Sequence, residues 1–355
     1  MRGEVWVYRF FDVAQEIHLD EVERLFVHHE AAVRRMRLLK VRPRSLEIKN
    51  LPVTVDLGEV ELPLAGQMLL GRLRARLYDF GVLSLVARIS LPENWDVEDV
   101  KRLSVELNED EENDPFERVF ADVREDIVRS LVGALEGEGS PEYVHEFTPY
   151  VLPEWPKERD AAELLLGEPK RLSEAMRREV LRHRVSYTDD AVIVTSVAAW
   201  TNDPEEAFDV GALLEFAHAQ FLELRYYDDL LDDELTKLYE ILENQRSWGF
   251  FSLRRHEEVM RYIMELLVET AEFTGRVRNA VKVTQDVYYL RLYQVALELL
   301  RVEEWSASVR EKMEILERNY ELLSDSYMTR RFMLIDTLIL LLIFLEIVLG
   351  FFFLR

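Results

Sequence analysis

The sequence predicts an α+β fold, in which an N-terminal domain with a mixed or antiparallel sheet and helices precedes a helical bundle. Three observations support this prediction. Strand-like patterns fill much of the first half, apolar residues recur at helical spacing from Pro204 onward, and an apolar segment covers residues 332–354. We expect the last helix of the bundle to continue into this segment as a single C-terminal transmembrane helix.

The strand signals lie mainly before residue 152. Residues 4–14 are rich in valine, tryptophan, tyrosine and phenylalanine, and residues 69–78 alternate between polar and apolar over most of their length. A break at Asp79-Phe80-Gly81 makes residues 82–91 the expected neighbour of 69–78. A further strand, 53–62, contains a predicted turn at Gly58.

Two helices are expected between these strands. Residues 20–39 have an acidic first turn and a basic last turn, which suits the helix dipole. Residues 114–135 begin with Asp-Pro, a pattern typical of a helix start. Residues 1–152 are therefore predicted to form an α+β cytosolic domain with helices on one face of the sheet.

The remainder of the chain divides into three predicted parts. Residues 153–203 form a connecting region of short helices with one strand at 191–200. Residues 204–331 form a helical bundle, in which one helix is expected to stop near Gly275. Residues 332–354 form the transmembrane helix.

The helix that precedes the apolar segment carries an apolar stripe. Its members recur three or four positions apart, as on one face of a helix: Trp305, Val309, Met313, Leu316, Tyr320, Leu323 and Tyr327. This stripe packs either against residues 281–300 of its own chain or against the same stripe of a second chain. Because the seam lasts only about three heptads, packing within the chain is favoured.

Residues 332–354 are expected to bind membrane lipid, because about 20 mostly apolar residues suffice to cross the hydrocarbon core as a helix. Arg330 and Arg331 precede the segment, and positive charge marks the cytoplasmic side. We therefore expect residues 1–331 in the cytosol. Arginine outnumbers lysine and no signal-peptide pattern opens the chain, which we interpret as a protein of a bacterial cytoplasmic membrane.

Glu346 lies about three residues past the middle of the apolar segment. An ionised carboxylate at that depth costs on the order of 2.5–3.5 kcal/mol, so we expect it to be protonated or hydrogen-bonded to another subunit. Asp336 lies close enough to the cytosolic interface to be hydrated. A homo-oligomer is the favoured consequence of Glu346, and a tolerated carboxylate is the alternative.

The composition excludes several classes of function. A net charge of −24 argues against binding of nucleic acid, and the absence of cysteine excludes disulfides and thiolate chemistry. No P-loop, dinucleotide-binding glycine pattern or nucleophile elbow occurs, so we predict no cofactor, no metal and no catalytic residue. Arg72, Arg74 and Arg76 share one face of a strand, which we expect to be solvated and paired with Glu59 and Glu61.

One helical segment, residues 212–228, combines an apolar pattern with polar side chains. We predict that it binds an unidentified protein partner through Glu215, His218, Glu223, Arg225 and Asp228. His218 is interpreted as a hydrogen-bonded core or interface histidine rather than a metal ligand. The acidic run that starts at Asp228 is interpreted as a solvated helix face, because it lacks the spacing of a calcium loop.

Three stretches carry a resemblance to known proteins. They are HRVSYTDD at 183–190, ALLEFAHAQFLELRYYD at 212–228, and the stripe from Trp305 to Tyr327 followed by a span containing LEIV at 345–348. Together they resemble uncharacterised bacterial proteins with one C-terminal span and, more distantly, the required-for-meiotic-nuclear-division family (domain of unknown function 155). The resemblance implies an α+β region, helices and a C-terminal span, and a role in tethering ribosomes to a membrane. The acidic N-terminal half, which we interpret as lacking a basic tract, disagrees with ribosome tethering.

These observations favour a non-enzymatic, membrane-anchored scaffold or adaptor. One alternative is a transport component similar in layout to CorA-type channels, although the second span and the Gly-Met-Asn signature of those channels do not occur here. The other alternative is a membrane-bound enzyme whose site is assembled from scattered acidic and arginine residues.

Overall fold

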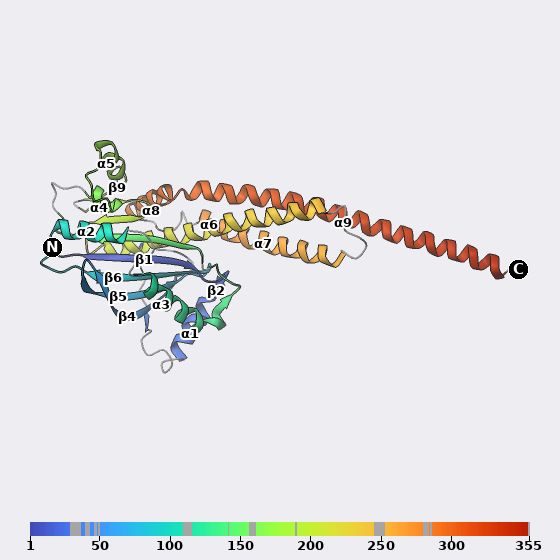
Figure 1. The fold of residues 1–355 in the computed structure, drawn as a ribbon, viewed down its shortest axis with the longest axis horizontal. Coiled ribbons are helices and arrows are strands. Elements are labelled where there is room, and N and C mark those ends of the chain that lie inside the picture. The colour runs from blue at the N-terminus through green and yellow to red at the C-terminus, as the bar shows by residue number, and fades with distance from the viewer. Residues whose placement is uncertain are drawn as a thin grey trace. The chain divides into compact units, whose positions relative to one another are not determined.

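A computed structural model describes residues 1–28, 37–39, 43–45, 48, 50–108, 116–140, 142–155, 161–188, 190–244, 253–279, 284 and 286–353. The chain divides into two compact units. Unit 1 comprises residues 1–226 and 276–305, and unit 2 comprises 227–275 and 306–355. The predicted fold class is confirmed: a mixed sheet with helices is followed by a helical region that ends in one apolar helix (Figure 1).

The described part of unit 1 contains a nine-stranded sheet in the order β3-β4-β5-β6-β1-β8-β11-β10-β9. All neighbouring strands are antiparallel except β8 and β11, which are parallel. The strands are β1 (Glu4–Asp12), β3 (Arg37–Leu39), β4 (Val53–Leu64), β5 (Gln67–Leu77), β6 (Val82–Ser90), β8 (Val144–Val151), β9 (Arg184–Val185), β10 (Val192–Val194) and β11 (Ala198–Thr201). A separate pair, β2 (Glu16–Ile17) and β7 (Leu135–Glu136), is also antiparallel.

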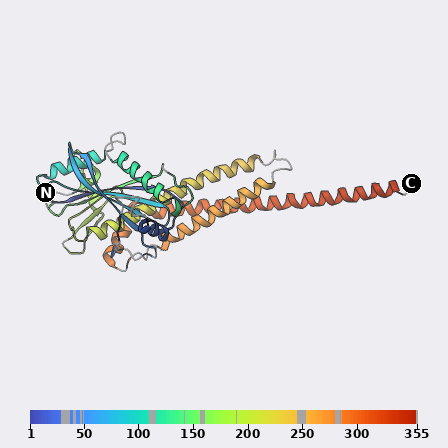
Figure 2. The same ribbon diagram turned by 90° about the horizontal axis from the view of Figure 1, so that it is seen from below.

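Helices lie on both faces of the sheet, and the central strand β1 is therefore buried on both sides. Val5, Val7 and Phe11 belong to an apolar core with α2 (Val97–Leu107), α3 (Glu117–Ser130) and α4 (Ala162–Leu166). The alternate residues Trp6, Tyr8 and Phe10 face the start of α6 (Ala207–Asn244). Figure 2 shows α2 and α3 on one side of the sheet and the start of α6 on the other. The prediction of helices on one face was therefore wrong.

The remaining helices of unit 1 are short. They are α1 (Leu19–His28), the 3-10 turn η2 (Val132–Ala134), α5 (Glu174–Leu181) and α8 (Val287–Leu299). Strands β9 to β11 join the same sheet as β1, and unit 1 contains residues on both sides of position 152. Residues 207–226 of α6 also belong to this unit.

Several predicted elements differ from the structure. The predicted helix 20–39 ends at His28 in the described residues, and 37–39 form strand β3. Gly58, at φ +87, lies in a bulge of one continuous strand rather than in a turn, because pairing with β5 continues on both sides. The predicted strand 191–200 is two strands, because the Thr195 hydroxyl accepts hydrogen bonds from the backbone of Val197 and Ala198 and closes a turn.

Unit 2 contains parts of three helices, namely α6 from residue 227, α7 (Leu253–Asn279) up to residue 275, and α9 (Val302–Phe353) from residue 306. The rings of Tyr227 and Phe273 stack at 5.3 Å between α6 and α7. Ser308 of α9 donates a hydrogen bond to Asp228 of α6 at 2.6 Å. Gly275 does not stop α7, since one glycine costs a helix only about 1 kcal/mol relative to alanine.

Candidate functional site

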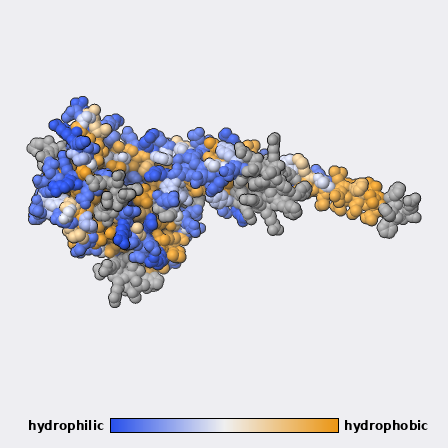
Figure 3. Space-filling view, viewed as in Figure 1, coloured by the Kyte–Doolittle hydropathy of each residue, from blue (hydrophilic) through white to orange (hydrophobic). Residues whose placement is uncertain are grey.

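The C-terminal part of α9 is the one described segment long and apolar enough to cross a membrane. It covers Arg331–Leu349, has a mean hydropathy of 2.7, and none of it is buried within the chain. Figure 3 shows this part of the helix as a continuous hydrophobic surface. Asp336 and Glu346 are exposed on it, as is Arg331 at its start, whereas the side chain of Arg330 falls outside the description.

The N-terminal part of α9 behaves in the opposite way. Val309 and Leu316 of the predicted stripe are fully buried, and Trp305, Met313 and Tyr320 are half-buried. Leu323 and Tyr327 lie in α9, but their side chains are not described. Within unit 2, Ser308 and Lys312 of this segment make polar contacts with α6, and packing of the stripe against residues 281–300 or against a second chain stays a prediction.

The predicted partner residues of α6 occupy the interior. Glu215, His218 and Glu223 are each at most 2 % exposed, and Glu215 and His218 face the sheet. Arg225 is half-buried with its guanidinium over the Phe221 ring, and Asp228 is 8 % exposed in unit 2. Three of the five residues are thus unavailable as a surface, and partner binding through this helix stays a prediction.

Glu215 forms an ion pair with Arg76 of β5 at 2.5 Å, and both groups are buried. Burial raises the pKa of the Glu215 carboxyl, and the Arg76 guanidinium beside it opposes that rise. Arg72 pairs with Asp56 at 2.5 Å. Arg72 also lies opposite its predicted partner Glu59, whereas Arg76 is buried, so the predicted solvated environment was wrong for Arg76.

His218 contacts His145 of β8, with 2.7 Å between Nδ1 of His218 and Nε2 of His145. Its ring also stacks on Phe147 at 3.9 Å and on Phe10 at 5.9 Å. Burial, with Arg225 and Arg9 adding to it, lowers the pKa of His145 to about 3. Burial lowers the pKa of His218 well below its usual range, so both rings are neutral in the folded protein.

This buried cluster has no room for a ligand. The cavity beside Glu215 and Arg76 has a volume of only about 10 Å³, which is the size of a single water site. Gly211 of α6 lies so close to Trp6 that an added Cβ would be 2.4 Å from the indole ring. The cluster therefore fixes the position of α6 on the sheet, in agreement with the interpretation of His218 as a core histidine.

The acidic run at the start of unit 2 contacts a lysine of α9. Asp228, Asp229 and Asp232 bring carboxylate oxygens within 4.8 Å of one another. The Lys312 ammonium lies 2.9 Å from Asp228 and 2.6 Å from Asp232. Asp228 and Asp232 therefore link α6 to α9 through Lys312.

A larger space opens in unit 1 between α2, α4 and α5. We call it the α2–α5 groove; it has a volume of about 700 Å³. Its walls are tied together, because the Ser104 hydroxyl of α2 donates to the backbone oxygen of Leu164 in α4 at 2.5 Å. Gly167, at φ +59, ends α4 and lies against Asn108, where an added Cβ would be 2.2 Å from the side-chain amide.

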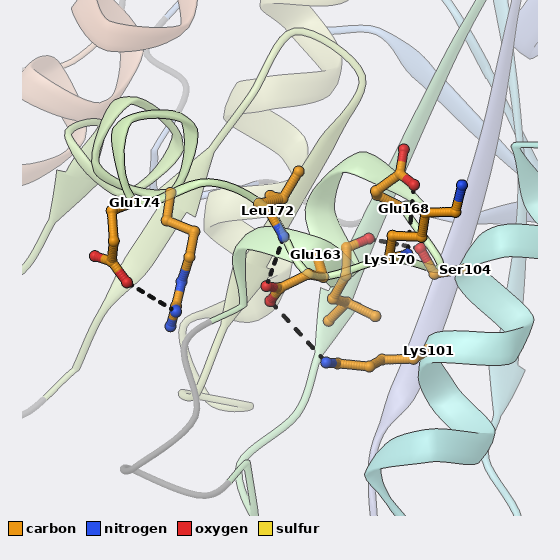
Figure 4. Close-up of polar contacts among 9 residues, drawn as sticks. Lys101, Ser104, Glu163, Glu168, Lys170, Leu172 and Glu174 are labelled. Atoms are coloured by element: carbon orange, nitrogen blue, oxygen red, sulfur yellow. Dashed lines mark hydrogen bonds and ion pairs between the residues drawn. The ribbon is translucent and has the colours of Figure 1, made fainter.

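The groove is lined by more cations than carboxylates. Five basic residues line it: Lys101, Arg102, Lys170, Arg171 and Arg177. Three carboxylates also line it: Glu98, Glu163 and Glu168. Figure 4 shows Lys101 of α2 reaching toward Glu163 of α4, with Glu163 also directed at the backbone nitrogen of Leu172.

The interpretation that the N-terminal half lacks a basic tract overlooked this region. Residues 170–184 contain six lysines and arginines and only two acidic residues, in a chain of net charge −24. The signal was the local run KRLSEAMRREVLRHR, which the overall acidity obscured. Helix α2 was also missed, although Asp96 and Asp99 form a capping box at its start.

The family of this chain follows from its N-terminal part. The family model described as "uncharacterized protein MJ0711, N-terminal domain" matches residues 2–209. Comparison with curated proteins and with solved structures gave no match, and no named relative confirms the resemblance to the required-for-meiotic-nuclear-division family. The matched residues contain the whole nine-stranded sheet and the lining of the α2–α5 groove, and they are more than half of the 355 residues. The chain therefore belongs to the family of the MJ0711 N-terminal domain.

Proposed function

We propose that this chain is a C-terminally membrane-anchored scaffold or adaptor, which holds an MJ0711-type domain at a membrane surface. The observation that carries the proposal is the exposure of Arg331–Leu349, an apolar helix with no partner in the described part of its own chain. In water such an apolar surface drives association. In a bilayer its side chains contact lipid, and the helical backbone already has its hydrogen bonds within the helix.

The orientation in this proposal rests on charge. Arg331 begins the apolar segment, so the sheet domain lies on the cytosolic side, and a bacterial cytoplasmic membrane is the proposed location. A single cysteine introduced at the exposed residue Arg118 tests this in intact cells, because the chain has no other cysteine. We expect no labelling by a membrane-impermeant maleimide until the cells are opened.

Glu346 is the basis for proposing that the chain forms a homo-oligomer. It is exposed in the single chain, and one helix has no means to shield a carboxyl group near the middle of a bilayer. A carboxyl that donates or accepts a hydrogen bond across two helices removes this cost.

Crosslinking through single cysteines at positions 338–345 tests the oligomer in native membranes. We expect crosslinked dimers or larger species with helical periodicity, retained in Glu346→Gln and lost in Glu346→Leu. Asp336→Leu is the matched control, since that carboxylate lies near the start of the segment and is hydrated there. A set of crosslinked species that is unchanged by Glu346→Leu contradicts the proposed role of Glu346 in the oligomer.

Affinity capture from native membranes, with the apolar segment intact, tests the adaptor role. The resemblance stated from the sequence makes ribosomes one proposed partner. A protein assembly recovered with the full chain but not with a chain carrying a disrupted span supports the adaptor role. Capture of no protein at near-native expression contradicts it.

A further inference from the structure

We propose that the α2–α5 groove binds a soluble small molecule that carries two or more linked phosphate groups. This inference concerns unit 1 alone and does not depend on membrane anchoring. The lining residues come from the family domain, from α2, from the loop after α4, and from α5.

The size of the groove matches a small ligand. Its volume of about 700 Å³ falls within the range of roughly 300–1,000 Å³ that is typical of ligand sites. Most of its lining residues are charged, so the affinity has to come from charge-assisted hydrogen bonds rather than from apolar contact.

The charges of the groove favour an anion. Five cations line the groove against three carboxylates, in a chain of net charge −24. Arg102 pairs with Asp99 at 3.0 Å and Arg177 with Glu174 at 3.4 Å, so Lys170 and Arg171 are the lining cations that carry the charge offered to a ligand. Two of the carboxylates are held by their own wall. Glu163 accepts a hydrogen bond from the backbone nitrogen of Leu172 at 3.4 Å and lies 4.0 Å from the Lys101 ammonium. Glu168 accepts from the backbone nitrogen of Lys170 at 3.4 Å.

Lys170 and Arg171 are available to a ligand. Both are exposed on the loop that follows α4, and neither forms an ion pair with any residue that the structure describes. The loop between Gly167 and Ser173 is held at both ends, by the close contact of Gly167 with Asn108 and by the Ser173 cap of α5. Because these two cations are presented from a fixed loop, less ordering is needed when a ligand binds.

The cations of the groove lie on three separate elements, which favours a ligand with more than one phosphate. Lys101 and Arg102 come from α2, Lys170 and Arg171 from the loop, and Arg177 from α5. Guanidinium groups bind phosphate oxygens in a bidentate manner, and a chain of linked phosphates reaches cations on separate elements at once.

The overall acidity favours a small ligand over RNA or a lipid surface. At physiological ionic strength charges are screened beyond about 8 Å, so the electrostatic energy of a ligand inside the groove depends mainly on the residues that line it. A long polyanion or an anionic membrane also meets the surrounding surface, which carries the net negative charge of the chain.

Isothermal titration calorimetry of the full chain in detergent micelles tests this inference, with inorganic tripolyphosphate as the probe. We expect saturable binding that weakens with salt, and binding at least about tenfold weaker in Lys170→Gln/Arg171→Gln. Arg102→Gln, on the opposite wall, is a second variant and is expected to weaken binding several-fold. The control, Arg178→Gln/Arg182→Gln, removes two charges from the same region outside the groove and is expected to change nothing.

Four results would each overturn the inference. They are no binding of tripolyphosphate by the unaltered chain, equal binding by Lys170→Gln/Arg171→Gln with an unchanged melting temperature, an equal loss in the control variant, and citrate binding as tightly as tripolyphosphate. Oligonucleotide binding that strengthens with length, or binding only to nanodiscs containing phosphatidylglycerol, would assign the groove to RNA or to lipid instead.

Discussion

The first half of α6 and the C-terminal part of α9 break the usual pattern of burial in opposite directions. In unit 1, α6 buries three ionisable side chains, Glu215, His218 and Glu223, of which Glu215 and His218 contact the sheet. In unit 2, α9 leaves the apolar segment Arg331–Leu349 wholly exposed. Each arrangement is costly unless something compensates for it, because buried charge needs a partner and exposed apolar surface needs a non-aqueous neighbour.

The compensation differs between the two helices. For α6 it lies within the chain, since Arg76 pairs with Glu215 and His145 contacts His218. For Arg331–Leu349 the described part of the chain offers none. Glu215 and His218 of α6 thus have partners within the chain, whereas Arg331–Leu349 needs an environment outside the chain, which is a bilayer in the proposed function.

The largest expected effect is on α9. Leu341→Lys/Leu342→Lys places two charges near the middle of the apolar segment, at a cost of about 2.5–3.5 kcal/mol each for membrane insertion. We expect the protein to leave the membrane fraction in a flotation assay. Leu322→Lys is the control, because Leu322 is equally exposed on the same helix but lies before the apolar segment. Flotation of the double variant at the level of the unaltered chain would contradict anchoring by this helix.

The next effect is on the buried ion pair of α6. Arg76→Met leaves Glu215 buried without its partner, which is expected to lower the free energy of unfolding by about 3–5 kcal/mol. Arg76→Met/Glu215→Leu removes both charges and is expected to recover most of that loss. Urea unfolding of the full chain in micelles measures both variants. Equal losses in the single and double variants would show that the pair does not compensate for burial.

The smallest effect is a pH dependence from the histidines of unit 1. Burial lowers the pKa of His145 to about 3, so between about pH 6.5 and 3 the unfolded chain binds a proton there that the folded chain does not. The free energy of unfolding therefore falls as the pH falls below 6.5, by about 2 kcal/mol at pH 5 from this group alone.

His145→Phe is expected to make the decline between pH 7 and pH 5 shallower by that amount, as measured by urea unfolding at each pH. Parallel curves for the unaltered chain and His145→Phe would show that His145 is protonated to the same extent in both states.

Strands with a clear two-residue period could be predicted from the sequence. The predicted strand 69–78 corresponds to β5, Gln67–Leu77, because Leu73 and Ala75 alternate with Arg72 and Arg74. The apolar segment of α9 was recognisable for the same local reason, since its composition alone decides the solvent it prefers.

Features that depend on contacts between residues far apart in the sequence could not be predicted. Arg76 and Glu215 are 139 residues apart, and nothing local to either one indicates a buried partner. The α2–α5 groove likewise requires α2 to lie beside α4, which is set by the contact of Ser104 with Leu164, 60 residues further along the chain. The basic loop of the groove could have been predicted from the adjacent residues Lys170 and Arg171. The negative net charge of the whole chain obscured this local signal.

The central claim is that Arg331–Leu349 lies in lipid, and spin labels on this cysteine-free chain test it directly. Single cysteines placed in turn at positions 331–349 are labelled in liposomes, and the accessibility of each label to oxygen and to a water-soluble nickel complex is measured. We expect the ratio of oxygen to nickel accessibility to rise to a maximum near residue 340 and to fall toward both ends. High nickel accessibility along the whole segment, or on one face of it at every depth, would contradict the claim.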